Sequence, residues 1–188
     1  MKCSLSKKIF WIVVGAILVG GGAALTMKAN VGIGAYDSVA KSISDATGLE
    51  VGTMGILTNC LCVFGSLCIL RKEFGIKQIL QVPFSILLGT VINFVYYELL
   101  TFPFSSFIGG ILLYIVGQVI VALGVAFVMI INEITFALEG FCDALTRYIP
   151  IPFSTMRQLA DVVSVIITVI MKFTLDLPWA IGIGTIMV

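Results

Sequence analysis

Long apolar runs alternate with short polar segments along the whole chain. A helix needs about 20 apolar residues to cross the hydrocarbon core of a bilayer. The runs lie at 9–27, 51–70, 76–100, 104–131, 153–171 and 179–188. This pattern predicts an all-α membrane protein with about six transmembrane helices. The sixth run is still apolar where the sequence stops, and a truncated carboxyl end is one interpretation of it.

Two polar segments, 30–50 and 132–152, interrupt the apolar runs. Each predicts a short amphipathic helix, because its apolar residues recur at helical spacing. The residues that carry this pattern are Tyr36, Val39, Ala40 and Ile43 in the first segment and Phe136, Phe141, Cys142 and Leu145 in the second. Two interpretations stay open. Each helix lies on the lipid headgroups, or each is a re-entrant element buried in the protein.

The two polar segments belong to an internal repeat. A shift of 102 residues aligns the chain with itself without a gap. Eleven identities result between positions 15 and 70: Gly15/Gly117, Val19/Val121, Gly22/Gly124, Ala24/Ala126, Met27/Met129, Asn30/Asn132, Ala35/Ala137, Thr53/Thr155, Met54/Met156, Leu57/Leu159 and Val63/Val165. The repeat divides one integral membrane domain into 1–100 and 101–188, with three spans in each half. Because three is odd, the second half enters the membrane from the opposite side, which is an inverted-topology repeat.

Glycines mark the first and fourth spans. Gly15 and Gly22 are seven residues apart, and so are their repeat equivalents Gly117 and Gly124. Seven residues return to nearly the same face of a helix, and small residues allow helices to pack closely in a membrane. We therefore expect these two spans to pack together near the pseudo-two-fold axis.

Composition narrows the function. The chain is 60% hydrophobic and 11% charged, has a net charge of +1 and contains no histidine. No basic surface for nucleic acid is visible, and the commonest acid–base residue and zinc ligand is missing. The five cysteines form no CxxC pair and are interpreted as small buried side chains. We expect no enzyme activity, no metal and no cofactor.

Lysines and arginines near the span ends predict the orientation. Six of them flank the first span and the loop between the second and third: Lys2, Lys7, Lys8, Arg71, Lys72 and Lys77. The opposite side receives three: Lys28, Lys41 and Lys172. We therefore predict a cytoplasmic amino terminus, with 29–50 on the outer side and 132–152, including Arg147, on the inner side.

Charged residues inside the fifth span indicate either a salt bridge or a site. Arg157 and Asp161 are four apart and share a helix face. Charges within a membrane are costly and usually face a cavity or a partner. Asp37 and Glu139 are repeat equivalents near the starts of the two short helices. We predict a polar cavity between the halves, with these candidate binding residues: Gly32, Gly34, Asp37, Glu139, Gly140, Arg157 and Asp161.

Two stretches resemble a known family. "NVGIGAYDSVAKSISDATGLEVGTMGIL" and "LEGFCDALTRYIPIPFSTMRQLAD", the second followed by "GIGT" at 182–185, are similar to the two halves of YczE/YitT-like integral membrane proteins of bacteria. An Asp-Gly pair, an arginine and an acid four residues on are usual there. Here they correspond to Glu139–Gly140, Arg157 and Asp161, with Glu for Asp at 139 and Asp for Glu at 161. The resemblance implies the fold and a bacterial plasma membrane location, but no specific activity.

The predicted function is a small-solute transporter or permease of unknown substrate. It rests on the inverted repeat and on the charges within the spans. The alternative is a substrate-binding or regulatory membrane subunit that works with a partner protein. The expected partners are the lipid bilayer, an unknown small solute, and either a partner subunit or further copies of the chain. No phosphate-binding GxxxxGK[ST] motif is present, so the chain is not itself an ATP-driven motor.

Overall fold

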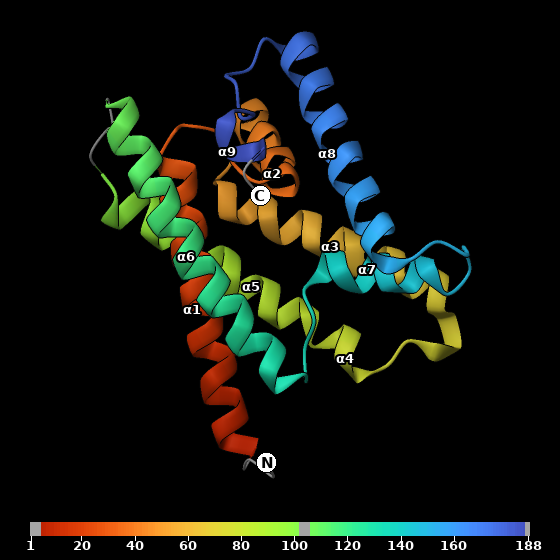
Figure 1. Ribbon diagram of the computed structural model, residues 1–188. Coiled ribbons are helices and arrows are strands. Elements are labelled where there is room, and N and C mark those ends of the chain that lie inside the picture. Colours follow the sequence, from red (N-terminus) through yellow and green to blue (C-terminus); the bar gives the residue numbers. More distant parts are fainter. Residues whose placement is uncertain (1–4, 102–105, 187–188) are drawn as a thin grey trace.

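The computed structural model describes residues 5–101 and 106–186, and this part of the chain is helical, without strands (Figure 1). The elements are α1 (Leu5–Lys28), α2 (Ala35–Thr47), α3 (Val51–Leu70), η1 (Arg71–Glu73), α4 (Ile76–Ile79), α5 (Gln81–Asn93), η2 (Phe94–Leu99), α6 (Phe107–Ile131), α7 (Ala137–Thr146), α8 (Phe153–Leu175) and α9 (Ile183–Ile186). The element η1 is a 3-10 turn, and η2 continues α5 as a π-helix.

Within the described residues, five segments are long and apolar enough to cross a membrane: Ser6–Lys28, Val51–Glu73, Ile76–Leu99, Phe107–Ile131 and Phe153–Leu175. The predicted all-α class is confirmed, and the protein is an integral membrane protein. The sixth run, 179–188, begins without regular structure and then forms the short helix α9. Its last two residues lie outside the described part, as do Lys2, Cys3 and the predicted start of the fourth span at Phe104.

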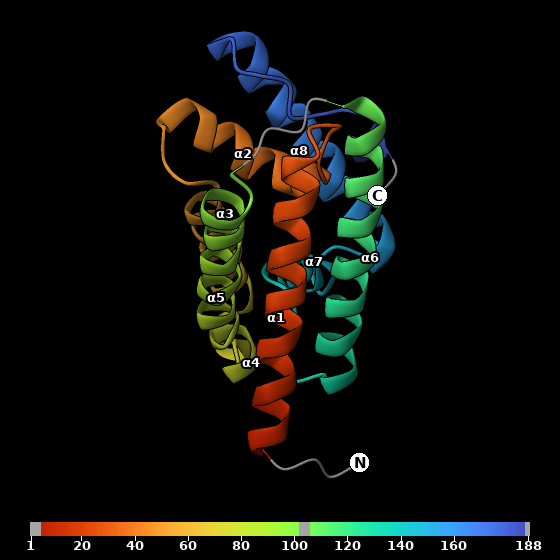
Figure 2. The ribbon, with the colours of Figure 1, turned by 90° about the vertical axis from the view of Figure 1, so that its left-hand side faces the viewer.

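Helices α1 and α6 pack antiparallel through glycines (Figure 2). A Cβ atom on Gly22 would lie 2.7 Å from the carbonyl oxygen of Gly117, and one on Gly117 would lie 2.9 Å from that of Gly22. One Cβ on Gly124 would meet the carbonyl oxygen of Gly15 at 2.8 Å. Hydrogen in place of a side chain is what lets the two backbones touch. All four glycines singled out in the sequence therefore lie at this contact.

Helix α5 packs against α1 and α3 and brings a polar cap to α3. The Asn93 Oδ1 accepts a hydrogen bond of 2.6 Å from the backbone N–H of Gly52. Its Nδ2 donates to Glu50 and Thr53. The first N–H groups of a helix have no partner within the helix. Asn93, a polar residue inside the third apolar run, thus satisfies the amino-terminal end of α3.

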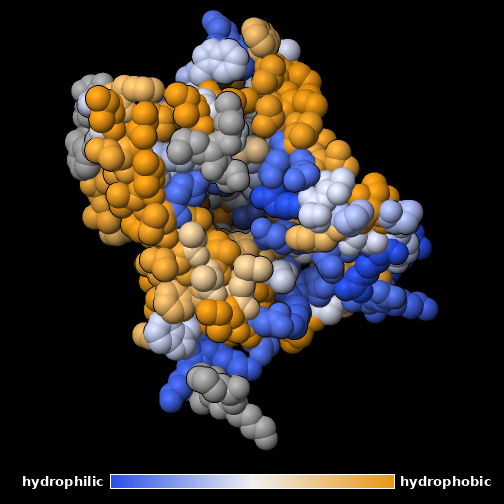
Figure 3. Space-filling view, viewed as in Figure 1, coloured by the Kyte–Doolittle hydropathy of each residue, from blue (hydrophilic) through white to orange (hydrophobic). Residues whose placement is uncertain are grey.

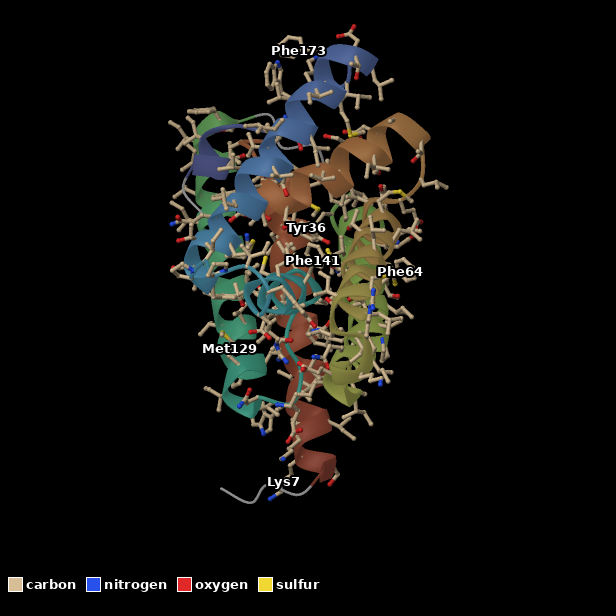
Figure 4. The ribbon with its side chains drawn as sticks, turned by 90° about the vertical axis from the view of Figure 1, so that its right-hand side faces the viewer. Lys7, Tyr36, Phe64, Met129, Phe141 and Phe173 are labelled. Atoms are coloured by element: carbon tan, nitrogen blue, oxygen red, sulfur yellow. The ribbon has the colours of Figure 1, made fainter. Side chains whose placement is uncertain are left out.

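The two short helices are covered by long helices from both halves of the chain. Helix α2 packs on α3 and α8, and α7 packs on the same two helices. Buried Ser38 of α2 shares a hydrogen bond of 2.8 Å with Thr168 of α8. Tyr36 of α2 and Phe141 of α7 both lie near the middle of the molecule in Figure 4. One side of each short helix is therefore in contact with other helices rather than with solvent.

A left-handed asparagine follows each of the two glycine-rich helices. Asn30 has φ 54° and Asn132 has φ 53°, and both precede the turn that leads into a short helix. Asparagine tolerates this conformation better than most residues. The turn after Asn30 is held by the carboxyl-terminal segment, because Gly184 N–H donates to Val31 O at 2.9 Å and Thr185 Oγ1 donates to Ile33 O at 2.7 Å.

Candidate functional site

A cavity of about 760 Å³ lies where the long helices surround the starts of α2 and α7. This volume falls within the range of small-molecule sites in proteins. Residues from both halves line it, and five of the predicted site residues are among them: Gly34, Asp37, Glu139, Arg157 and Asp161. In Figure 3, hydrophilic side chains show in the hollow between the hydrophobic surfaces of α6 and α8.

The two short helices each present one acid to this cavity. Asp37 is the third residue of α2, and Glu139 is the third residue of α7. An acid in the first turn interacts favourably with the positive end of the helix dipole. The equivalent placement of both carboxylates therefore has a local cause, while the packing of α2 and α7 brings them to the same space.

Arg157 is the cationic residue of the cavity lining, and carboxylates lie on two sides of it. It pairs with Asp161 one turn further along α8, and its Nε lies 3.9 Å from the Glu139 Oε1. A guanidinium stays charged in proteins, so it needs anionic partners where water is scarce. The ion pair thus links the start of α7 to α8.

Two carboxylates of the cavity keep unused hydrogen-bonding capacity. The Glu139 Oε2 is buried and has no hydrogen-bond partner among the described residues. Asp37 has no ion pair within 4.0 Å in the same part of the chain. Buried polar atoms are nearly always paired in folded proteins. The unpaired oxygens therefore indicate that something polar completes the site.

Burial changes how these acids bind protons. It raises the pKa of the Asp37 carboxyl to about 6, against the opposing effect of the nearby Arg157 guanidinium. Burial also raises the pKa of Glu139, and Arg157 again acts in the opposite direction. A carboxyl with a pKa near 6 is ionised at neutral pH and protonated in mildly acidic solution. The charge of the cavity therefore depends on pH.

Neutral polar side chains complete the lining, and the sequence analysis did not assign them to the site. The Tyr36 hydroxyl donates to the Asn59 Oδ1 at 3.1 Å, and the Gln118 Nε2 donates to the Tyr114 hydroxyl at 2.8 Å. Gln158 also faces the cavity. The available signal was the presence of an amide inside an apolar run, as at Gln118.

Two of the predicted site residues, Gly32 and Gly140, lie against other segments instead of lining the cavity. Gly32 has φ +102°, and a Cβ there would collide with the backbone of Gly182. A Cβ on Gly140 would collide with the side chain of Gln81, whose Nε2 donates to the Thr135 hydroxyl at 2.8 Å. Both glycines thus permit close contacts next to the turns before α2 and before α7.

The described residues offer no group of three or more His, Cys, Asp or Glu side chains that could hold a metal ion. Cys60, Cys62, Cys68 and Cys142 are free thiols.

The fold and the site define an integral membrane protein with a cavity lined by charged residues. The chain belongs to DUF6198, a family of unknown function, whose sequence profile matches residues 6–188. No curated protein and no solved structure matches the chain significantly.

Proposed function

We propose that the protein is a small-solute permease of the bacterial plasma membrane, without enzymatic activity, built from two inverted repeats. The observation that carries the proposal is the cavity in which Asp37, Glu139, Arg157 and Asp161 meet. Secondary transporters typically bind their solutes at the interface of two repeats, near the ends of short or broken helices. Costly charges that face a shared cavity in a membrane protein favour a solute pathway over a purely structural role.

Reciprocal contacts support the inverted repeat. Under a shift of 102 residues, the contact of Gly15 with Gly124 becomes the contact of Gly117 with Gly22, and both are present. Likewise α2 packs on α8 while its equivalent α7 packs on α3. A two-fold axis perpendicular to the antiparallel pair α1 and α6 relates such contacts. An axis of this kind lies in the plane of the membrane, as inverted repeats require.

The distribution of basic residues supports an amino terminus in the cytoplasm. Lys8 pairs with Glu133, Lys77 donates to the Asn132 carbonyl at 2.8 Å, and Arg147 pairs with Glu73 at 3.0 Å. The beginning of α1, the end of α6 and the loop after α3 therefore share one end of the molecule. Excess lysine and arginine marks the cytoplasmic side. The resemblance to YczE/YitT-like proteins is part of the same proposal.

A second candidate function is that of a substrate-binding or regulatory subunit. The hydrophobic surfaces of α6 and α8 on both sides of the hollow favour it, because a partner protein could cover them (Figure 3). The two functions differ in what the purified chain does alone. A permease moves solute by itself, whereas a subunit binds solute and requires its partner for transport.

A solute screen followed by reconstitution tests the proposal. Compounds that raise the unfolding temperature of the purified chain are added as radiolabelled solutes to proteoliposomes that contain it. We expect saturable uptake, reduced by Asp37→Asn and by Arg157→Gln and unchanged in Glu98→Gln, since Glu98 is exposed and outside the cavity. Solute binding without uptake would favour the subunit, and a screen in which no solute binds would contradict both functions.

A further inference from the structure

The charges that line the cavity do not balance. Asp37, Glu139 and Asp161 supply three carboxylates, and Arg157 supplies the single guanidinium of the lining. Arg157 is engaged by Asp161 and by one oxygen of Glu139. Asp37 and the second oxygen of Glu139 are left without a partner among the described residues. With all four groups ionised, the cavity has a net negative charge, and a cation is the ligand that compensates it.

The walls of the cavity distinguish an organic cation from a metal ion. Apolar and aromatic side chains form much of the lining: Leu88, Ile92, Val121, Val125, Phe136 and Tyr36. Hard inorganic cations require several oxygen ligands around one point, and this cavity has its few carboxylates among alkyl groups. An ammonium group suits such a site, because its charge is spread, its substituents can contact apolar walls, and it is attracted to aromatic faces.

The surroundings of the cavity point to the same chemistry. The hollow in Figure 3 lies between α6 and α8. On these helices, side chains such as Val119, Leu123, Val163 and Ile166 are exposed on surfaces that lipid covers in a membrane. A solute with an apolar body partitions into that region, whereas a strongly hydrated ion does not. Size agrees as well, since about 760 Å³ exceeds what a single small ion needs.

We propose that this cavity binds a lipophilic monovalent organic cation, with the cationic nitrogen between Asp37 and Glu139 and the apolar body against Phe136 and the aliphatic walls. The inference deepens the proposed function and rests on it, because it names the solute class for the same cavity. It assigns different roles to the four charges. Asp37 and Glu139 contact the ligand, whereas Asp161 holds Arg157 and thereby leaves Asp37 available.

Three probes of similar size test the role of charge. Benzyltrimethylammonium carries the cation, neopentylbenzene is its neutral isostere with carbon in place of nitrogen, and benzenesulfonate carries a negative charge. Binding to the purified full-length chain in detergent is measured by calorimetry at neutral pH. We expect the cation to bind at least about tenfold more tightly than the neutral isostere, since a charge pair in a partly dry site exceeds that factor. Benzenesulfonate should not bind.

Matched variants locate the nitrogen. Asp37→Asn and Glu139→Gln should each weaken binding of benzyltrimethylammonium by about tenfold, and the double variant should bind it no better than neopentylbenzene. Glu98→Gln is the control, since it removes an acid that is exposed and does not line the cavity. The unfolding temperature of each variant is measured in parallel, and Asp37→Glu, which retains the charge, should retain binding if the loss in Asp37→Asn is electrostatic.

The outcomes separate the inference from the proposed function. Equal binding of cation and isostere, preferred binding of benzenesulfonate, or full cation affinity in the folded double variant would overturn the organic-cation assignment. If proteoliposomes nevertheless take up another solute, the permease stands and only its solute class is wrong. If the cation binds as expected but is never transported, the cation site stands and the protein is a binding subunit.

Discussion

Arg157 differs from the acids of the cavity, because its charge cannot be removed by a change of protonation. The side chain is about one third exposed, and that exposure faces the cavity. The negative charges of Asp161 and Glu139 stabilise it. When one member of a buried pair is removed, the other is left uncompensated, whereas joint removal avoids that penalty.

Asp161→Asn should therefore lower the free energy of unfolding by roughly 1–3 kcal/mol. This loss is smaller than for a fully buried pair, because Arg157 and Asp161 border a cavity. The double variant Arg157→Gln with Asp161→Asn should be more stable than Asp161→Asn alone. Thermal unfolding in detergent provides the measurement. If the double variant is also as responsive to solute as the unmodified protein, the pair is structural and takes no part in the site. A double variant that loses the full sum of both single effects would contradict the pairing itself.

The burial of Asp37 predicts that the stability of the folded protein depends on pH. Burial raises its pKa to about 6 in the folded protein, so folding favours the protonated carboxyl. The free energy of unfolding therefore falls as the pH rises from about 4 towards 6, and it stays lower above that range. The groups that face it are Arg157, Asp161, Glu139 and Tyr36. Asp37→Asn should raise the unfolding temperature at about pH 8, and the gain should shrink at about pH 5. Parallel melting curves at both values test this, and a gain that is independent of pH would show that the carboxyl is not titrating there.

Sequence alone can place some of these residues and not others. The spacing of Arg157 and Asp161 within one helix shows that they share a face, and the repeat identifies Asp37 and Glu139 as equivalents. The approach of Glu139 to Arg157 depends on how α7 folds back on α8, which no local pattern encodes. For the same reason Gln118 could be recognised as a polar residue in a span, but not as part of a wall of the cavity.

At the scale of elements, the contact of α1 with α6 depends on glycines two turns apart on each helix, Gly15 and Gly22 on α1 and Gly117 and Gly124 on α6. Gly22 lies against the backbone of Gly117, whereas a Cβ atom on its neighbour Gly21 would have open space around it. The two adjacent glycines thus provide a matched pair: the same helix, the same helix propensity, and different surroundings.

Gly22→Ala should destabilise the fold by about 1–3 kcal/mol, because the added methyl forces two closely packed backbones apart. Gly21→Ala should be neutral or slightly stabilising, since alanine is the better helix former. Gly124→Ala should behave like Gly22→Ala, because it meets the carbonyl oxygen of Gly15. Unfolding temperatures of the three variants in one detergent give the comparison. Equal effects at 21 and 22 would indicate that close α1–α6 packing contributes nothing to stability.

The apolar pattern predicted the first five long helical segments, whereas the described part of the sixth run contains only the short helix α9. Local chemistry set the ends of the long helices. The third run, 76–100, is divided into α4 and α5, with Pro83 in the first turn of α5, where a missing N–H costs little. Helix α6 begins at Phe107 because the Ser106 hydroxyl accepts a hydrogen bond from Gly109 N–H. Hydropathy does not register such breaks and caps, since it averages over many residues.

At the scale of the whole molecule, each half packs its short helix against a long helix of the other half. Neither half could therefore form the cavity alone. The repeat in the sequence indicates two equivalent units, but it does not say how they interlock. That information lies in contacts between residues more than 100 positions apart, such as Ser38 with Thr168.

Orientation in the membrane is the prediction that tests this arrangement most directly. If the halves are inverted, the carboxyl ends of α2 and α7 face opposite sides of the membrane, because α1 and α6 are antiparallel and each leads into one short helix. Thr47 and Ile149 are exposed repeat equivalents at these ends. In a variant with all cysteines replaced, Thr47→Cys should react with a membrane-impermeant maleimide added outside intact cells. Ile149→Cys should react only after the cells are opened.

Controls for this experiment are available within the chain. Lys7→Cys, near the start of α1, should behave like Ile149→Cys, and Asp176→Cys, at the end of α8, should behave like Thr47→Cys. Each variant must retain the unfolding temperature of the cysteine-free protein, so that labelling reports topology rather than unfolding. Labelling of positions 47 and 149 from the same side would contradict the inverted repeat. A cavity would still lie between α2 and α7, but alternating access through a symmetric pair of halves would no longer follow from the fold.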